Sequence, residues 1–189
     1  MRPPCIDSVE GFRHADAVGE AVQPKTYPEY LAFEGEAETK HEFVDGQIVA
    51  MAGGTAEHAR LAANVSAALV AALRGRPCSA FSAELRVHVP ATGRTTYPDV
   101  TIVRHERRTA DVDGDAITNP TVIVEVLSPT TEASDRGEKF AHYRRLDSLR
   151  EYVLVSQGEP RIEVYRRETT SGPFATTAPA RRPSSPRST

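Results

Sequence analysis

The clearest periodic pattern lies between Thr55 and Arg74 and predicts an α-helix. Its large apolar side chains recur at every fourth position, at Leu61, Val65, Leu69 and Leu73. This spacing places them on one face of the helix, and the alanines between them allow close packing against a sheet. Gly75 follows where a C-terminal cap is expected.

Two further helices are predicted, one on each side of this segment. Thr26 followed by Pro28 is typical of a helix start, and Gly35 is expected near the end of that helix. Residues 134–146 predict the other helix, with its aromatic side chains facing inward and its charges outward.

Alternating and continuous apolar runs predict the strands. HEFVDGQIVAM predicts a β-hairpin, because Asp45-Gly46 between apolar runs is typical of a tight turn with positive φ. Three strands are predicted after the long helix, at residues 81–89, 97–103 and 121–127. The last of them is almost continuously apolar, which indicates a central strand covered on both faces. EYVLVS and RIEVYRR, joined by QGEP, predict a closing hairpin.

The predicted order of elements indicates an α/β fold. A helix, three strands, a helix and a strand are preceded by a hairpin and followed by one more strand, and the helix before the fourth strand makes the sheet parallel or mixed. We expect one domain over residues 26–168. Residues 1–25 are predicted to be a flexible leader, and the Ser/Thr/Pro/Arg-rich residues 169–189 a disordered tail.

Composition excludes several classes of protein. The chain has 189 residues, 39% hydrophobic and 26% charged, which is ordinary for a globular domain. Cys5 and Cys78 cannot form a disulfide framework, and no Cys/His spacing resembles a zinc site. Without a secretory signal or an apolar run long enough to span a bilayer, we expect a cytoplasmic protein that does not contact membranes. A net charge of −3 argues against permanent coating of nucleic acid.

Two acids in apolar strands are the candidate chemistry. Glu125 lies in the middle of VIVEVL, where an unpaired carboxylate would cost several kcal/mol. Asp99 lies in YPDVTIV, one strand earlier. If the two strands are neighbours, both carboxylates can share a hard cation such as Mg²⁺. The alternative is that each acid is an edge residue or is bound to an arginine.

TYPDV and the later stretch VIVEVLSPTTEASDRGEKFAHYRRLDSLREYVLV resemble the Uma2 family, a branch of the PD-(D/E)xK nuclease superfamily. The resemblance extends from about Tyr27 to Arg167. It implies a restriction-endonuclease-like αβββαβ core, with Asp99 and Glu125 as metal-binding carboxylates. It further implies Mg²⁺, with Mn²⁺ as an alternative, as the cofactor and DNA as the substrate.

One position departs from the superfamily pattern. The lysine expected two residues after the glutamate is replaced by Leu127, and the resemblance implies that Lys139 takes its catalytic role from the next helix. Tyr143 follows one turn later on the same face. Glu42 and His58 also match family positions, where each is an extra metal ligand or phosphate contact; the alternatives are a solvated hairpin residue and helix-terminus packing.

Other polar residues are weaker candidates. Glu84 lies on the polar face of its predicted strand and is more typical of a solvated residue. Five arginines are candidate contacts to a nucleic-acid backbone, although charge runs are usually solvated: Arg104, Arg107, Arg108, Arg144 and Arg145. No aromatic residues are interleaved with them to stack on bases.

Three functional hypotheses follow. The first is a Mg²⁺-dependent endonuclease that hydrolyses phosphodiester bonds of DNA. A homodimer of such an enzyme would cut both strands. The second is a non-catalytic nucleic-acid-binding or regulatory module that retains the nuclease fold. The third is a defective copy, because the Pro/Ser/Thr/Arg tail after EVYRR looks unrelated to the preceding domain.

Overall fold

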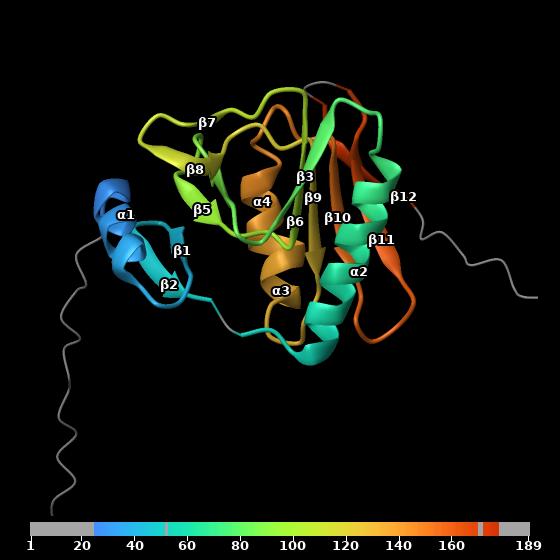
Figure 1. The fold of residues 1–189 in the computed structure, drawn as a ribbon, viewed down its shortest axis with the longest axis horizontal. Helices are drawn as coiled ribbons and strands as arrows, with labels where there is room; N and C mark the ends of the chain where they lie inside the picture. The colour runs from blue at the N-terminus through green and yellow to red at the C-terminus, as the bar shows by residue number, and fades with distance from the viewer. Residues whose placement is uncertain (1–24, 52, 170–171, 178–189) are drawn as a thin grey trace, which may run out of the picture.

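A computed structural model describes residues 25–51, 53–169 and 172–177. They form two six-stranded mixed sheets with few helices (Figure 1). The helical elements are α1 (Tyr27–Glu36), α2 (Ala56–Ala72), α3 (Glu132–Ser134), the π-helical turn η1 (Asp135–Lys139) and α4 (Phe140–Tyr143). Among the helices of these ranges, none combines the length and the hydropathy that crossing a membrane requires.

The first sheet has the strand order β2-β1-β5-β4-β8-β7. Its strands are β1 (His41–Val44), β2 (Gln47–Ala50), β4 (Arg86–Val89), β5 (Arg94–Thr96), β7 (Thr109–Ala110) and β8 (Asp113–Ile117). The second sheet has the order β12-β11-β10-β9-β6-β3. Its strands are β3 (Cys78–Ser82), β6 (Val100–Arg104), β9 (Val122–Val126), β10 (Glu151–Val155), β11 (Ile162–Arg167) and β12 (Phe174–Thr177).

The second sheet carries the core. Along the chain, α2 precedes β3, β6 and β9, which pair antiparallel, and the helical segment α3–η1–α4 leads to β10, which lies parallel to β9. The sheet therefore buries an apolar layer on each face. Side chains of α2 such as Val65 pack with Val124 on one face, and Tyr143 packs with Tyr152 on the other. In Figure 1, these strands run between α2 and the α3–α4 segment.

Local sequence signals predicted several elements correctly. Thr26 caps α1 in a capping box with Glu29, because each side chain accepts a hydrogen bond from the other residue's backbone N–H. Asp45 and Gly46 have φ of 49° and 78° in the turn of the β1–β2 hairpin. Gly75 has φ of 72° just after α2, as expected of a C-terminal glycine.

The predicted strand 81–89 is wrong as a continuous element, and the predicted strand 97–103 begins three residues before β6. Residues 81–82 belong to β3 in the second sheet and residues 86–89 form β4 in the first, so the chain changes sheets at a turn. A second change occurs between β5 and β6, at Tyr97-Pro98-Asp99. The alternation of apolar and polar residues could not show these breaks, because side chains alternate between the two faces with a period of two in either sheet.

Two regions outside the predicted strands contain strands. Residues 105–120, between the predicted strands 97–103 and 121–127, include β7 and β8, which extend the first sheet. Within the predicted tail, β12 pairs antiparallel with β11. Phe174 of β12 packs edge-on against Phe140, with 5.4 Å between ring centroids, so the domain extends beyond residue 168. The predicted leader, apart from Lys25, and residues 178–189 lie outside the described residues.

Candidate active site

Asp99 and Glu125 meet because β6 and β9 are neighbours, the condition under which the sequence analysis expected the two acids to come together. Val100 pairs with Val124, which sets the two acids side by side at the same end of the sheet. The Val126 N–H donates to Asp99 Oδ2 at 2.7 Å, and the Asp99 N–H lies 3.4 Å from Glu125 Oε2. Their side chains are only 13% and 5% exposed, so both carboxylates are held in a low-dielectric environment.

The helical segment brings two polar side chains to Glu125. Lys139 Nζ lies 3.6 Å from Glu125 Oε1, and the Tyr143 hydroxyl donates to the same oxygen at 3.0 Å. The Tyr143 oxygen lies 2.6 Å from the buried Thr96 hydroxyl, which is therefore the donor in that bond. Lys139 ends the π-helical turn, a local widening of the helix that is frequent at functional sites.

The Lys139 ammonium lies among three carboxylates. Besides Glu125, it is 3.1 Å from Glu42 Oε1 and 3.2 Å from Asp135 Oδ1. Burial alone would lower the pKa of the Lys139 amine, but the three acids outweigh burial and raise its pKa above the ordinary value. Lys139 is therefore a fixed cation at neutral pH and not a general base.

Burial dominates the electrostatics of the two central acids. It raises the pKa of Glu125 well above its usual range, against the opposing effect of Lys139. It also raises the pKa of Asp99, although the Val126 N–H and His58 partly offset this rise. Each carboxylate therefore gains from a nearby cation, because a cation favours its ionised form.

Glu42 supports the lysine. Its second oxygen lies 3.4 Å from Arg94 Nη2, and Arg94 is buried and also bound to Glu138 at 2.6 Å. Across the described ranges, no group of three His, Cys, Asp or Glu side chains is arranged to hold a metal ion, and Glu42 contacts Lys139 and Arg94. Mg²⁺ commonly uses only one or two carboxylates, with waters and substrate phosphates completing its shell, and the pair of Asp99 and Glu125 fits that donor set.

His58 contacts Asp99 from the first turn of α2. Its Nε2 lies 3.2 Å from Asp99 Oδ2. The Thr55 hydroxyl caps the helix by accepting from the His58 N–H at 3.1 Å, and it donates to Gln157 Oε1 at 3.2 Å. Gln157 in turn donates to the Leu127 carbonyl at 2.6 Å, so the loop after β9 and the start of α2 are tied together.

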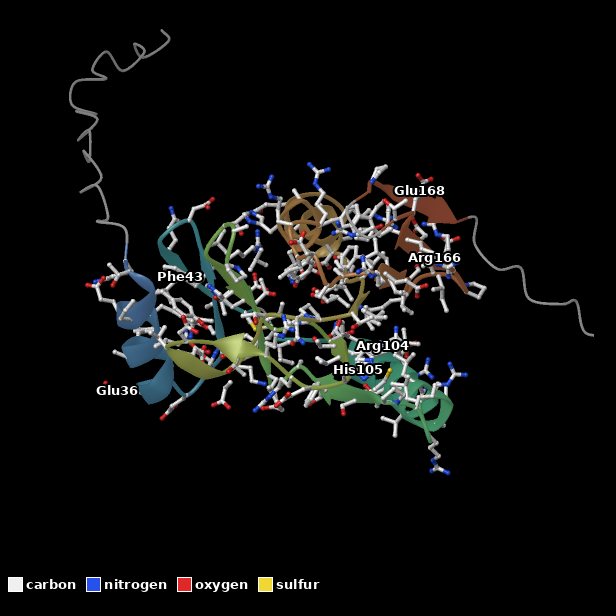
Figure 2. All side chains as sticks on the ribbon, turned by 90° about the horizontal axis from the view of Figure 1, so that it is seen from above. Glu36, Phe43, Arg104, His105, Arg166 and Glu168 are labelled. Atoms are coloured by element: carbon white, nitrogen blue, oxygen red, sulfur yellow. The ribbon has the colours of Figure 1, made fainter. Side chains whose placement is uncertain are left out.

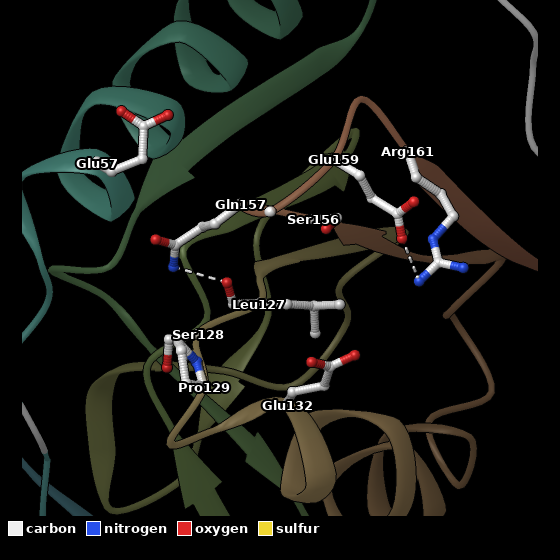
Figure 3. Close-up of a pocket in the computed structure, with 10 residues that line it drawn as sticks. Glu57, Leu127, Ser128, Pro129, Glu132, Ser156, Gln157, Glu159 and Arg161 are labelled. Carbon is white, nitrogen blue, oxygen red and sulfur yellow. Dashed lines mark hydrogen bonds and ion pairs between the residues drawn. The ribbon is translucent and has the colours of Figure 1, made fainter.

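A cleft of about 690 Å³ opens onto these groups. Asp99, Glu125 and Lys139 line it, together with Asp135 and His58. A neighbouring hollow of about 600 Å³, drawn in Figure 3, shares Ser128 and Pro129 with the cleft but is rimmed by the acids Glu57, Glu132 and Glu159. Of the two, the cleft brings together Asp99, Glu125 and Lys139, and it is therefore the candidate site.

Three residues of the site were not identified from the sequence. Asp135 stands four residues before Lys139, a spacing that could have indicated a shared helical face. Arg94 and Thr96 lie between the predicted strands 81–89 and 97–103, and the pairing of β5 with β1 and β4 brings them to Glu42 and Tyr143. No local signal marks a residue that reaches a site through sheet pairing.

The arginines predicted to contact nucleic acid lie elsewhere. Arg104 ends β6, five residues beyond Asp99, which corresponds to about 16 Å along a strand. Arg107 and Arg108 follow in the next loop, and Arg144 and Arg145 follow α4 at the same end of the sheet. Glu84 is exposed and binds Lys40 at 2.6 Å.

A family model for Uma2, described as "Putative restriction endonuclease", matches residues 27–186. The chain belongs to the Uma2 family. The resemblance noted from TYPDV and VIVEVL is thereby confirmed. The match also continues through most of the tail, so the expectation that this tail is unrelated to the domain was wrong.

Two similar proteins come from Synechocystis sp. (strain ATCC 27184 / PCC 6803 / Kazusa). The uncharacterized proteins sll1609 and slr1290 are 36% and 38% identical to this chain over 142 and 145 residues. The alignments cover 75% and 76% of this chain, and 80% and 75% of the relatives.

A solved structure shares the fold. The crystal structure of a "putative nuclease belonging to DUF820" from Anabaena variabilis ATCC 29413 matches with a TM-score of 0.65 and 20% identity. The match covers 81% of this chain and 84% of that chain. The mixed α/β architecture is therefore that of a nuclease-like fold.

Proposed function

We propose that this Uma2 protein is a Mg²⁺-dependent endonuclease that hydrolyses phosphodiester bonds of DNA. The observation that carries the proposal is the buried pair Asp99 and Glu125, held against each other's strands beside the Lys139 ammonium. Two carboxylates and one fixed cation, opening onto one cleft, are the groups that metal-assisted phosphodiester hydrolysis needs.

The charge balance of the site supports a divalent cation. Four largely buried carboxylates, those of Glu42, Asp99, Glu125 and Asp135, face two permanent cations, Lys139 and Arg94. With all four acids ionised, these six side chains together carry a formal charge of −2. Because unpaired buried charge is costly, a doubly charged ion on Asp99 and Glu125 would stabilise it.

Each residue has a distinct role in this proposal. When bound there, Mg²⁺ would supply positive charge to the scissile phosphate and acidify the attacking water. Lys139 holds a proton at Nζ throughout and stabilises the negative charge that develops on the phosphate. Tyr143 and Glu42 are positioning residues, since one orients the Glu125 carboxylate and the other fixes the lysine.

A cleavage assay with supercoiled plasmid tests the proposal. Purified protein should nick DNA with Mg²⁺ and not with EDTA, and Mn²⁺ should replace Mg²⁺. Absence of cleavage together with absence of metal binding would favour the non-catalytic module instead. We further propose that the protein acts in the cytoplasm and that a homodimer would bring one site to each strand of a duplex.

A further inference from the structure

Three loops meet at the end of the second sheet that lies opposite the carboxylates. The His105 N–H donates to the Pro77 carbonyl at 2.6 Å, which joins the loop after α2 to the loop after β6. The N–H groups of Arg104 and Arg150 both donate to Thr121, at 3.2 Å and 2.8 Å, which joins the loop before β10 to the others. Figure 2 looks onto this end, with Arg104 and His105 labelled.

These loops are rich in arginine and poor in acids. The three loops contain two acidic residues, Glu106 and Asp147, in the ranges 73–77, 104–108 and 144–150. We call the following exposed residues the arginine end: Arg74, Arg76, Arg104, Arg107, Arg108, Arg144 and Arg145. The local charge is thus strongly positive in a chain whose net charge is −3.

The side chains of the arginine end have no internal partners. In the part of the chain that the structure describes, none of the seven guanidinium groups forms an ion pair with a carboxylate or a side-chain hydrogen bond. Solvent-accessible arginines elsewhere are paired: Arg60 with Glu57, Arg136 with Glu163, Arg161 with Glu159 and Arg166 with Glu151. Guanidinium groups without partners are therefore concentrated at one end and available to an external anion.

A hollow of about 380 Å³ adds a recess to this surface. Arg144 and Arg145 line it, with the buried Arg167 and the ring of Phe174. Arg167 donates to the backbone carbonyls of Arg144 and Leu146, at 2.7 and 3.0 Å, and is therefore held rigidly. Arg167 also donates from Nε to the Leu149 carbonyl at 2.9 Å, so its Nε and Nη2 donors are already used. A phosphate at the hollow would therefore bind chiefly the guanidinium groups of Arg144 and Arg145.

We propose that the arginine end binds the sugar–phosphate backbone of a nucleic-acid duplex, at a surface separate from the cleavage cleft and without metal. The proposal rests on the proposed function only for the identity of the polyanion. The recognition would be independent of base sequence, because guanidinium–phosphate contacts carry no sequence information. The surface lies about 16 Å beyond Asp99, so it would hold substrate that the cleft does not enclose.

The test is duplex binding in EDTA. Fluorescence anisotropy with a labelled duplex of about 30 base pairs would compare wild-type protein with a triple variant, Arg76→Gln, Arg107→Gln and Arg145→Gln, which changes one arginine in each loop. The matched control is Arg60→Gln, Arg161→Gln and Arg166→Gln, which changes the net charge equally. We expect the first variant to bind at least about tenfold more weakly, and its slope of log Kd against log salt to fall by about 2.7, or about 0.9 per lost phosphate contact. The control should stay within about twofold of wild type.

Equal weakening of both variants would overturn the proposal, since bulk charge would then explain binding. Failure of wild-type protein to bind duplex while it sediments with anionic phospholipid vesicles would overturn it as well. Loss of binding only in the arginine-end variant supports it even if Mg²⁺ produces no cleavage, in which case the proposed function alone fails. Cleavage by wild-type protein with unaltered binding by the variant would reject this surface and leave the proposed function standing.

Discussion

Asp99 and Glu125 are each held by the backbone of the other's strand. The carboxylate of Asp99 accepts from the amide that follows Glu125, and the carboxylate of Glu125 lies 3.4 Å from the Asp99 amide. This reciprocal arrangement requires β6 and β9 to be antiparallel neighbours with Val100 opposite Val124. The pairing of the sheet therefore sets the geometry of the pair, and side-chain flexibility contributes little.

The first prediction concerns this pair. Asp99→Asn and Glu125→Gln should each reduce Mg²⁺-dependent plasmid cleavage at least about 100-fold, because each removes a charge that would hold the metal. Both substitutions keep the shape of the side chain, and circular dichroism should show an unchanged fold. Glu159→Gln, an exposed acid bound to Arg161, is the control and should cleave normally. Cleavage that survives both changes would exclude this site.

The second prediction concerns Lys139. Lys139→Gln leaves Glu42, Glu125 and Asp135 without their shared cation, so the free energy of unfolding at neutral pH should fall by about 3 kcal/mol. Urea denaturation measures this change, and cleavage should fall at least about 100-fold. Lys40→Gln should cost less than about 1 kcal/mol, since its partner Glu84 is exposed. A loss no larger than that of the control would contradict the assigned contacts.

The third prediction concerns metal binding to the folded protein. If Mg²⁺ binds with a Kd of about 1 mM, about 10 mM Mg²⁺ should stabilise the protein by about 1.4 kcal/mol. For a domain of this size, the midpoint temperature of thermal unfolding (Tm) should rise by about 3–6 °C. The double variant Asp99→Asn/Glu125→Gln should show no rise, and calorimetry should detect no binding to it. An equal rise in both proteins would place the metal elsewhere.

The fourth prediction concerns pH and the first sheet. Burial alone would raise the pKa of Asp113, but hydrogen bonds from Arg86, at 2.8 and 2.7 Å, and from Tyr27 outweigh burial and lower it. Because the folded pKa is depressed, the ionised form stabilises the protein fully above the unfolded pKa of about 3.9, and this stability is lost as pH falls through the folded pKa.

The Asp113→Asn variant measures that contribution. At pH 7 it should be less stable than wild type by about 2 kcal/mol in urea denaturation, since the buried pair is broken. The difference should shrink steadily below about pH 4. The control is Asp111→Asn, on the exposed turn before β8, which should change the free energy of unfolding at pH 7 by less than about 0.5 kcal/mol. A gap that stays constant down to pH 2 would show that the carboxylate is not involved.

The fifth prediction concerns β12. Phe174 packs against Phe140, and its ring faces the Arg167 guanidinium at 4.6 Å. Phe174→Ala should therefore lower the free energy of unfolding by about 2 kcal/mol, less than a fully buried phenylalanine would cost. Thr176→Ala on the exposed side of the same strand should change it by less than about 0.5 kcal/mol. If the two variants are equally stable, β12 contributes nothing to the domain.

Much of the fold was readable from the sequence because its signals are local. The Asp45-Gly46 turn and the Thr26 and Gly75 caps depend only on backbone geometry within a few residues. The buried central strand β9 depends only on an unbroken apolar run. Glu125 was identified as a candidate site residue for the same local reason, since a carboxylate inside such an apolar run needs a compensating partner.

The partners of that carboxylate were decided by the tertiary structure. Arg94 and Thr96 reach Glu42 and Tyr143 through strand pairing, and Asp135 and Lys139 reach the cleft from a π-helical turn. A period along the chain predicts none of these contacts. The same holds for the arginine end, whose loops meet only because α2, β6 and α4 all finish at one end of a sheet. Sequence determines which local conformation a segment prefers, whereas side chains far apart in the chain meet only when distant segments bury their apolar faces together.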